Sequence, residues 1–421
     1  MKVQRKLFRK IKKLYTFQGV KSKDGLNPKR EDLSLTENGA IMVEDDRIVW
    51  SGEDKKLRRA LQSHKWSPRS LKEIDAIKDL DIETILPAFI DPHTHLVFAG
   101  DRKNEFEMRN QGLNYQDIAA RGGGIRATVR ATREARDKDL LNLAQERANR
   151  LISQGVTTVE IKSGYGLREA DELKILQTAQ KIKNIRVVAT YLGPHAIPEG
   201  MTADEYLDEI LNSTLAKARK YAQRADMFIE NGYFSMPQAR QYFEAARKLG
   251  YGLTAHSDQL TRTGASVELA RLKAQSVDHC VQISESDVRE LARLNSVSTC
   301  VLLPTSDFYL KMKYPPARAL IDAGARVALA TDFNPGTSPT LELSLVGVLA
   351  RLEMRMTLPE VLAGFTFNAA RALGLESLLG CISDGYFADF IGLKSSIDSL
   401  FYDVGHHPIS LVVHKGRMVT I

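Results

Sequence analysis

Eight short apolar runs, most of them separated by amphipathic helical segments, constrain the fold of this chain more than any other feature. Short continuous apolar runs are typical of strands buried on both faces, and such strands alternate with helices in parallel sheets. Eight strand-then-helix units in roughly 290 residues predict an α/β fold, a TIM-type (β/α)8 barrel. The candidate strands are residues 85–95, 157–164, 186–195, 225–230, 251–258, 275–280, 296–304 and 326–333.

The helical segments between these runs carry start and stop signals. The segment at 137–153 is apolar along one side, and another begins at Ser235 and stops at Gly250. Ser284 and Asp287 form a capping-box pattern at the start of a third. An open doubly wound sheet is the alternative arrangement, but no GxGxxG fingerprint follows a candidate strand. The repeat therefore favours the barrel.

The two ends of the chain differ from the middle in their pattern of predicted strands and turns. Up to residue 86 the chain shows short strands and polar turns, including two alternating runs around Asp45 and Asp46 that predict a hairpin. Residues 381–421 show the same pattern of short strands and polar turns. We therefore predict that residues 1–86 and 381–421 lie outside a barrel domain of residues 87–380.

The charge distribution and the cysteine content indicate which partners and which cellular compartment to expect. Lys and Arg outnumber Asp and Glu by 59 to 52, but residues 1–13 carry seven of these cations, which leaves 52 of each sign elsewhere. A short basic arm is typical of a solvated terminal strand, whereas a nucleic-acid binder carries a basic face across a domain. Three cysteines without CxxC spacing favour a reducing, cytoplasmic setting. No apolar run is long enough to span a membrane.

Histidines and one aspartate lie where the predicted strands end. Because the carboxyl ends of barrel strands meet at one mouth, these side chains should converge there. A single histidine at a strand end is usually a hydrogen-bonded structural residue, but six converging polar residues indicate a site. The six are His93, His95, His195, His256, His279 and Asp332.

The spacing of His93 and His95 puts both imidazoles on one face of a strand, because side chains alternate along it. With His256 and Asp332 they make a set of three nitrogens and one oxygen that suits one divalent metal ion, zinc or iron. A metal held in this way lowers the pKa of its water towards ~7. Asp332 can accept that proton and return it to a leaving nitrogen. The pattern therefore predicts a hydrolase that cleaves a polarised C–N bond.

The sequence around these positions resembles the amidohydrolase superfamily and, within it, the imidazolonepropionase family. The superfamily pattern is matched by LPAFIDPHTH, by the later His256 and His279, and by ATDFNPG. The finer resemblance covers nearly the whole chain, and long unusual strings make it far more specific than a short motif. These strings are residues 95–112, 118–135, 157–167, 192–200, 302–310, 314–324 and 328–339.

The resemblance implies hydrolysis of the ring C–N bond of 4-imidazolone-5-propanoate to N-formimidoyl-L-glutamate, a step of histidine degradation. It also implies the four metal ligands named above, a homodimer, and a small β-sandwich built from both chain ends. Arg102 is chemically suited to clamp a propanoate in bidentate fashion, and His195 to donate to the imidazolone oxygen. Tyr115 is a weaker candidate. The substrate-binding positions implied are Arg102, Tyr165, His195, Asn334, Gly336 and Thr337.

Some positions depart from the commonest family pattern. Three residues after His256, where some members carry an acid, the chain has Gln259, whose amide can hydrogen-bond substrate but cannot act as a base. Catalytic proton transfer is therefore assigned to Asp332. His279 is expected to orient this aspartate from outside the metal shell, although a ligand role stays open.

A second metal would need a bridging carboxylate at the end of the fourth strand. Glu230 is a weak candidate there, and Lys162 follows the wrong strand, so one metal is predicted. Two other functions stay open. One is a nucleobase or cyclic-amidine deaminase, which would have no need of Arg102 with Tyr165. The other is a non-enzymatic nucleic-acid or membrane binder that uses residues 1–13.

Overall fold

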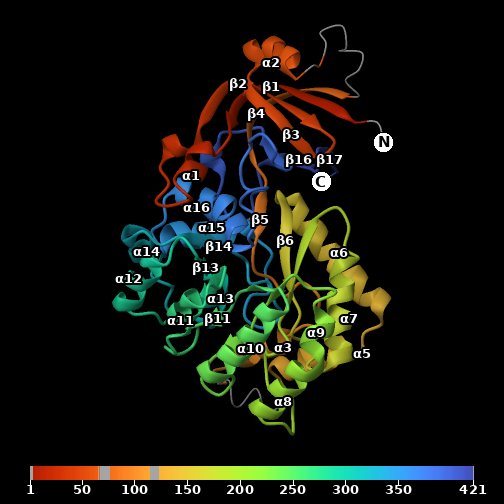
Figure 1. Ribbon diagram of the computed structural model, residues 1–421, viewed down its shortest axis with the longest axis vertical. Helices are drawn as coiled ribbons and strands as arrows, with labels where there is room; N and C mark the ends of the chain where they lie inside the picture. Colours follow the sequence, from red (N-terminus) through yellow and green to blue (C-terminus); the bar gives the residue numbers. More distant parts are fainter. Residues whose placement is uncertain (1–2, 65, 67–75, 114–122, 421) are drawn as a thin grey trace.

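The structure, a computed structural model, describes residues 3–64, 66, 76–113 and 123–420 (Figure 1). Both chain ends lie in a β-rich part, whereas the middle of the chain forms a larger part with helices outside short parallel strands. The long strand β4 leads from the first part towards β5 in the second. The α/β class and the barrel are therefore confirmed.

The barrel strands form two five-stranded parallel sheets, in the orders β10-β8-β7-β6-β5 and β14-β13-β12-β11-β9. The fourth and fifth strand positions are each divided into two short pieces, which accounts for ten labels at eight positions. Backbone bonds from His95 N to Phe333 O (2.9 Å) and from Asp332 N to His93 O (3.1 Å) join the first position to the eighth. The strands are β5 (Phe89–Asp91), β6 (Val156–Lys162), β7 (Arg186–Tyr191), β8 (Arg224–Ala225), β9 (Phe228–Ile229), β10 (Gly252–Leu253), β11 (His256–Ser257), β12 (Ser276–His279), β13 (Thr299–Leu302) and β14 (Val327–Leu329).

The helices around the barrel begin and end close to the predicted signals. Helix α6 spans Asp137–Ser153, α10 follows the N-cap Ser235, and the Ser284 side chain accepts from the backbone N–H of Asp287 at α12. A π-helical turn, Ile210–Thr214, separates α8 from α9. The helices are α3 (Lys103–Asn110), α5 (Ile125–Glu134), α6, α7 (Glu169–Gln180), α8 (Ala203–Glu209), α9 (Leu215–Ala218), α10 (Met236–Lys248), α11 (Ala265–Arg271), α12 (Glu285–Arg293), α13 (Pro304–Leu310), α14 (Ala317–Ala323), α15 (Leu343–Leu352), α16 (Leu358–Gly364) and α17 (Phe367–Ala372).

The chain ends combine in one mixed sheet with the order β17-β16-β15-β4-β1-β2-β3. Contacts between the two chain ends show that the sheet curls. Ile48 N donates to Tyr386 O (2.9 Å), and Ala388 N donates to Asp46 O (2.8 Å). The rings of Phe8 and Phe390 lie 5.1 Å apart. The boundaries of the two domains stay a prediction. The strands are β1 (Arg5–Tyr15), β2 (Leu35–Glu44), β3 (Arg47–Glu53), β4 (Ala76–Pro87), β15 (Phe390–Leu393), β16 (Ile409–His414) and β17 (Arg417–Val419), with the short helices α1 (Gln18–Ser22) and α2 (Leu57–Ser63) beside them.

The first predicted barrel strand, residues 85–95, is longer than the strand in the structure. Residues up to Pro87 belong to β4, which pairs with β1 and β15 in the mixed sheet, and only Phe89–Asp91 pairs with β6 in the barrel. The apolar run continues unbroken through both sheets, so hydrophobicity alone cannot mark where the chain passes from one to the other.

The basic N-terminal arm is mostly strand β1, and carboxylates lie beside it. Lys10 pairs with Asp79 at 3.1 Å, and Lys12 and Lys13 pair with Glu83 at 3.1 and 3.0 Å. The expectation of a terminal strand is therefore confirmed. Within the described ranges, no helix is both long enough and apolar enough to cross a bilayer.

The mixed sheet contacts the amino ends of the barrel strands. Arg186, the first residue of β7, pairs with Asp389, and Phe89 N donates to Gly155 O (2.9 Å) beside Ile391. The carboxyl ends of the strands therefore point away from the mixed sheet, and the predicted site residues lie at that end.

Candidate active site and metal centre

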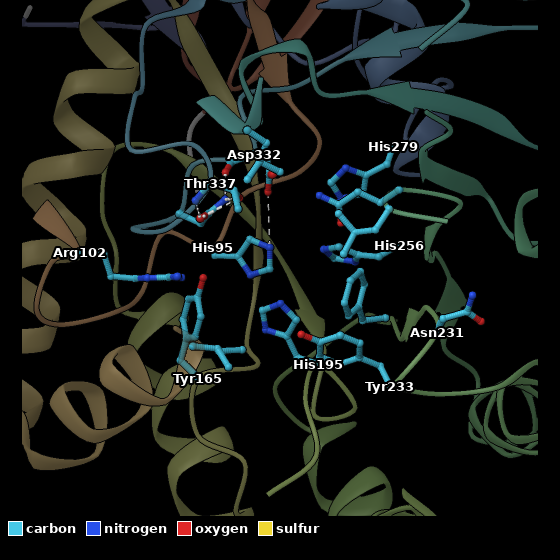
Figure 2. Close-up of a pocket in the computed structure, with 16 residues that line it drawn as sticks. His95, Arg102, Tyr165, His195, Asn231, Tyr233, His256, His279, Asp332 and Thr337 are labelled. Atoms are coloured by element: carbon cyan, nitrogen blue, oxygen red, sulfur yellow. Dashed lines mark hydrogen bonds and ion pairs between the residues drawn. The ribbon is translucent and has the colours of Figure 1, made fainter. Parts of the chain in front are cut away.

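The six strand-end residues converge as predicted. Figure 2 labels all of them except His93, namely His95, His195, His256, His279 and Asp332. Their nitrogen and oxygen atoms form three overlapping groups, and within each group the atoms lie within 4.8 Å of one another. Such spacing suits three ligands of a single ion. The groups are His93 with His256 and His279, His95 with His195 and His256, and His93 with His95 and Asp332.

Two buried carboxylates lie against the rings of two of these histidines, and among the described residues only the contact to His93 has hydrogen-bond geometry. His93 Nδ1 lies 2.7 Å from Asp278 Oδ2, and His256 Nδ1 lies 3.0 Å from Asp226 Oδ2. A carboxylate on one ring nitrogen sets the tautomer and directs the other nitrogen to a metal. Within the described residues His93 Nε2 has no hydrogen-bond partner. Neither aspartate stood out in the sequence, although Asp278 immediately precedes His279.

Lys162 lies behind these carboxylates and balances their charge. Its Nζ lies 2.8 Å from Glu160, 2.8 Å from Asp226 and 3.5 Å from Asp278, and all four side chains are fully buried. Burial alone would lower the pKa of Lys162, but the three carboxylates raise it above its ordinary value. Burial raises the pKa of Asp278 to about 6. Lys162 is thus a buried counter-ion whose ammonium is committed to three carboxylates.

The carboxylate of Glu230 accepts hydrogen bonds from the loop after the fifth strand position. Its carboxylate accepts from the backbone N–H groups of Leu260 (2.8 Å), Thr261 (3.1 Å) and Asn231 (2.9 Å). A carboxylate committed to three backbone donors has little capacity left for metal ions. The weak candidate for a bridging ligand therefore fits a role in holding the loop.

Asp332 lies between the first pair of histidines on an unusual backbone turn. Its Oδ1 is 3.4 Å from His93 Nε2 and 3.7 Å from His95 Nε2, and burial raises the pKa of this carboxyl to about 7. The residue has a left-handed φ of 52°. The preceding Thr331 is held by Asp91, which accepts from its hydroxyl at 2.6 Å and from its N–H at 3.2 Å.

His279 does not hydrogen-bond Asp332. Neither of its ring nitrogens has a hydrogen-bond partner among the described residues, and burial lowers its pKa well below the ordinary value. It also has a left-handed φ of 74°. The predicted orienting contact to Asp332 is therefore absent from this arrangement, and the neutral ring is equipped to act as a ligand.

A cavity of about 380 Å³ opens beside the histidines and contains most of the predicted substrate-binding residues. Arg102 and Asn231 lie on opposite sides of the histidine cluster in Figure 2. Of the predicted residues, Arg102, Tyr165, His195, Gln259, Asn334 and Thr337 line the cavity. Lining residues that the sequence did not single out are Ile125, Phe228, Asn231, Tyr233, Leu260 and Leu310.

Arg102 reaches the cavity already paired. Its Nε and Nη2 donate to Glu105 Oε2 at 2.8 and 2.5 Å, and the other Glu105 oxygen accepts from Gly124 N at 2.8 Å. A Cβ at Gly336 would overlap the Arg102 guanidinium, which explains glycine at this position. Because Glu105 takes one edge of the guanidinium, only the remaining edge can meet a substrate carboxylate.

His195 has a fixed tautomer. Its Nδ1 lies 3.1 Å from the carbonyl oxygen of Gly164, which can only accept, so Nδ1 carries the proton. Burial lowers the pKa of this imidazole to about 3, so the ring is neutral and Nε2 holds a lone pair. In this arrangement His195 accepts a hydrogen bond or binds a metal, which differs from the donor role expected from the sequence.

Two polar side chains in the loops near the site serve the loops themselves. Asn334 Oδ1 accepts from Gly336 N (2.9 Å) and Thr337 N (2.7 Å), and its amide donates to Asp332 O (2.7 Å). Asp258, next to Gln259, accepts from the backbone after the fifth strand position. Gln259 itself faces the cavity. Tyr115 lies outside the described residues.

Comparisons with known proteins identify the family of this chain. The Amidohydrolase family pattern matches residues 84–419. The chain is 48% identical to imidazolonepropionase of Bdellovibrio bacteriovorus, over 98% of this chain and 96% of that protein. It is 38% identical to the Bacillus velezensis imidazolonepropionase, over 92% and 91%. A solved structure of atrazine chlorohydrolase from Arthrobacter aurescens, complexed with zinc, is similar in fold, with a TM-score of 0.68 and 17% identity over 98% and 94%. The chain therefore belongs to the imidazolonepropionase family of the amidohydrolases.

Proposed function

We propose that this chain hydrolyses the ring C–N bond of 4-imidazolone-5-propanoate to N-formimidoyl-L-glutamate, a step of histidine degradation. The observation that carries the proposal is the meeting of a buried His/Asp cluster with a cavity that also contains Arg102 and Tyr165. The cluster supplies hydrolytic chemistry, and the arginine supplies a partner for the propanoate. The chain is 48% and 38% identical to two imidazolonepropionases over nearly its full length, which supports the same substrate.

One divalent metal ion, zinc or iron, would be held by His93, His95, His256 and Asp332. The fit rests on buried ring nitrogens without hydrogen-bond partners in the described part of the chain, on the carboxylate of Asp278 that orients His93, and on the carboxylate of Asp226 that lies 3.0 Å from His256. Imidazole and carboxylate ligands suit either metal, and such an ion would polarise the ring carbonyl and acidify water. His279 is available as a further ligand.

Asp332 moves the proton in this proposal. The water oxygen attacks the ring carbonyl carbon and its proton passes to the Asp332 carboxylate. The C–N bond then breaks, and the same proton is delivered to the departing nitrogen of the formimidoyl group. The new carboxylic acid keeps the second water proton and loses it to solvent as it becomes a carboxylate. The Asp332 carboxyl lies at the cluster, with its Oδ1 3.4 Å from His93 Nε2, where it can take the proton from water and return it to the departing nitrogen.

The remaining lining residues position the substrate. The free edge of Arg102 would receive the propanoate, with Tyr165 donating its phenol proton. His195 Nε2 would accept from a ring N–H of the substrate, and the Gln259 amide would meet the ring edge. Asn334, Gly336 and Thr337 would act through the loop that allows Arg102 to approach.

We also propose a cytoplasmic setting, because all three cysteines are free and buried. A homodimer and the division into residues 1–86 with 381–421 and residues 87–380 are carried forward as predictions. The β-rich domain would then support the amino ends of the barrel strands and leave the site open.

The test is a coupled assay in which urocanase generates the imidazolone and its ultraviolet absorbance is followed. Metal-loaded protein should consume the imidazolone fast, chelated protein should not, and reloading should restore the rate. Asp332→Asn should stay folded and lose turnover. Consumption at the uncatalysed rate by folded, metal-loaded protein would refute the substrate. Ammonia release from nucleobases or cyclic amidines would then favour a deaminase.

A further inference from the structure

A second cavity, of about 420 Å³, adjoins the catalytic one. Arg102 lines both cavities, and Gly336, which allows the close approach of Arg102, lines the second. Cations dominate the polar part of its wall, and Asp101 is the one acidic residue among the described residues that line it. The cations are Arg102, Lys103, Arg109, Arg147 and Arg150.

Three of the five cations are paired with carboxylates. Lys103 lies 3.0 Å from Asp101, Arg102 is bonded to Glu105, and Arg150 lies 3.8 Å from Glu342. These contacts compensate their charges at least in part. The two other arginines determine the net charge of the cavity.

Arg109 and Arg147 have no carboxylate oxygen within 4 Å in the described part of the chain. Arg109 instead donates to Gly336 O at 2.9 Å, and Arg147 to Leu96 O at 2.8 Å and Phe98 O at 2.7 Å. Carbonyls satisfy donors but carry no net charge, so both guanidiniums keep a full positive charge. Burial lowers the pKa of both, to about 10 for Arg147, as expected of cations that lack an anion.

The two uncompensated charges come from different elements of the fold. Arg109 belongs to α3, whereas Arg147 and Arg150 belong to α6. The wall also contains the apolar surfaces of Phe98, Phe333, Pro335 and Pro339. Two anionic groups joined by a short apolar chain would match these cations from two helices and the apolar surfaces beside them.

We propose that this cavity is a second anion site that binds a small organic dicarboxylate. Arg109 receives one carboxylate, and Arg147 with Arg150 receives the other. The site stands on the charge and shape of this cavity and does not depend on the proposed reaction, although the product of that reaction belongs to the same chemical class. Because Arg102 lines both cavities, an occupant is expected to change substrate binding.

A reporter at the rim of the second cavity can test the proposal directly. Phe106 lines this cavity and is 45% exposed, whereas the two native tryptophans, Trp50 and Trp66, lie beside the curled sheet. Phe106→Trp therefore places a separate fluorophore at the site. Titration of this variant with glutarate should give a saturable change, and the uncharged glutaramide should give none.

Two further variants locate the anion. Adding Arg109→Gln should weaken glutarate binding about tenfold or more, the usual worth of a charged hydrogen bond, and Arg109→Lys should restore part of it. Adding Tyr165→Phe, which keeps the ring beside Phe98 and removes a hydroxyl from a side chain that lines the catalytic cavity and not the second, should leave glutarate binding unchanged. Calorimetry of glutarate with the wild-type chain and Arg109→Gln repeats the comparison without the reporter.

Three outcomes would overturn the proposal. The first is that glutarate binds no more tightly than glutaramide. The second is that Arg109→Gln binds glutarate as tightly as the wild type in calorimetry. Weakening by Tyr165→Phe with none from Arg109→Gln would place the anion in the catalytic cavity. Each of these outcomes is independent of whether the imidazolone is the substrate.

Discussion

At the scale of single residues, the donors around the site divide by what their hydrogen bonds already hold. The side chains of Asp258 and Asn334 accept hydrogen bonds from the backbone of nearby loops. Neither ring nitrogen of His279 has a hydrogen-bond partner among the described residues. The sequence placed His279 and Asn334 near the mouth, since they lie at or just after the ends of predicted strands. It could not rank them, because a hydrogen-bond partner on a distant segment leaves no local pattern.

The pairing of Asp278 with His93 predicts an effect on metal affinity. Asp278→Asn removes the charge that orients His93 and raises its basicity, so zinc affinity should fall about 10- to 100-fold. Competition with a chromophoric chelator would measure this. Asp101→Asn, at an aspartate outside the cluster, serves as the control and should bind zinc like the wild type. Equal affinities for Asp278→Asn and the wild type would show that the pair does not support the metal.

Arg102 makes a separate prediction about substrate binding. Arg102→Ala should raise KM about 10- to 100-fold, the worth of one charged hydrogen bond, with a smaller effect on kcat. Arg126→Ala, which removes an arginine paired only loosely with Glu199 at 3.6 Å, is the control. Steady-state kinetics in the coupled assay measures both. An unchanged KM in Arg102→Ala would remove the carboxylate contact from the proposal.

At the scale of elements, local signals predicted helices better than strands. The cap at Ser235 and the box at Ser284 act within one turn, so the sequence alone located α10 and α12. Strand ends depend on distant partners. Residues 85–95 were predicted as one strand because nothing local shows that two sheets share the run, and the fourth and fifth strand positions are divided where polar residues turn into the site.

The start of α12 carries a pH-dependent prediction. Asp287 accepts from Ser284 N at 2.8 Å and from Arg262 Nε at 2.8 Å, and the Arg262 hydrogen bond lowers its pKa to about 2. Because the folded pKa lies below the unfolded one, this stabilisation is present above pH ~4 and is lost as pH falls towards 2. Asp287→Asn should cost about 1 kcal/mol near neutral pH, as caps do, and less at pH 3.

Urea denaturation of wild type and variant at pH 7, 5 and 3 would measure the difference in unfolding free energy. Ser22→Ala is the control, since the Ser22 hydroxyl donates to the carbonyl oxygen of Gly19 at 2.8 Å and not to a carboxylate, and its cost should not vary with pH. A constant cost of Asp287→Asn across this range would show that the Arg262 pair contributes nothing.

At the scale of the whole molecule, the sequence predicted the position of the site better than its chemistry. Convergence of strand ends is a property of the fold, so a correct barrel placed His93, His256 and Asp332 together. The tautomer of His195 and the pairing of Arg102 with Glu105 depend on contacts that only the folded chain defines. These contacts changed the expected roles of both residues without changing where they lie.

The joint between the mixed sheet and the barrel yields a prediction about the molecule as one unit. Asp389 is buried at this joint, where Arg186 donates to it from the barrel and His414 Nδ1 lies 3.1 Å away in the sheet. Burial alone would raise the pKa of Asp389, but His414 and Arg186 hold it below the ordinary value. Its stabilisation is therefore present above pH ~4 and falls as the carboxylate is protonated at lower pH.

Asp389→Asn leaves the Arg186 cation buried without its partner, which typically costs about 3–5 kcal/mol. Asp398→Asn is the control, because the Asp398 pair with Arg30 is more than half exposed and such pairs contribute about 0–1 kcal/mol. Calorimetric unfolding at pH 7 should show a clearly lower midpoint for the first variant only, still in one transition if sheet and barrel unfold together. Equal midpoints for the two variants would show that the joint does not stabilise the molecule, and a second transition in Asp389→Asn would show that Asp389 couples two separable units.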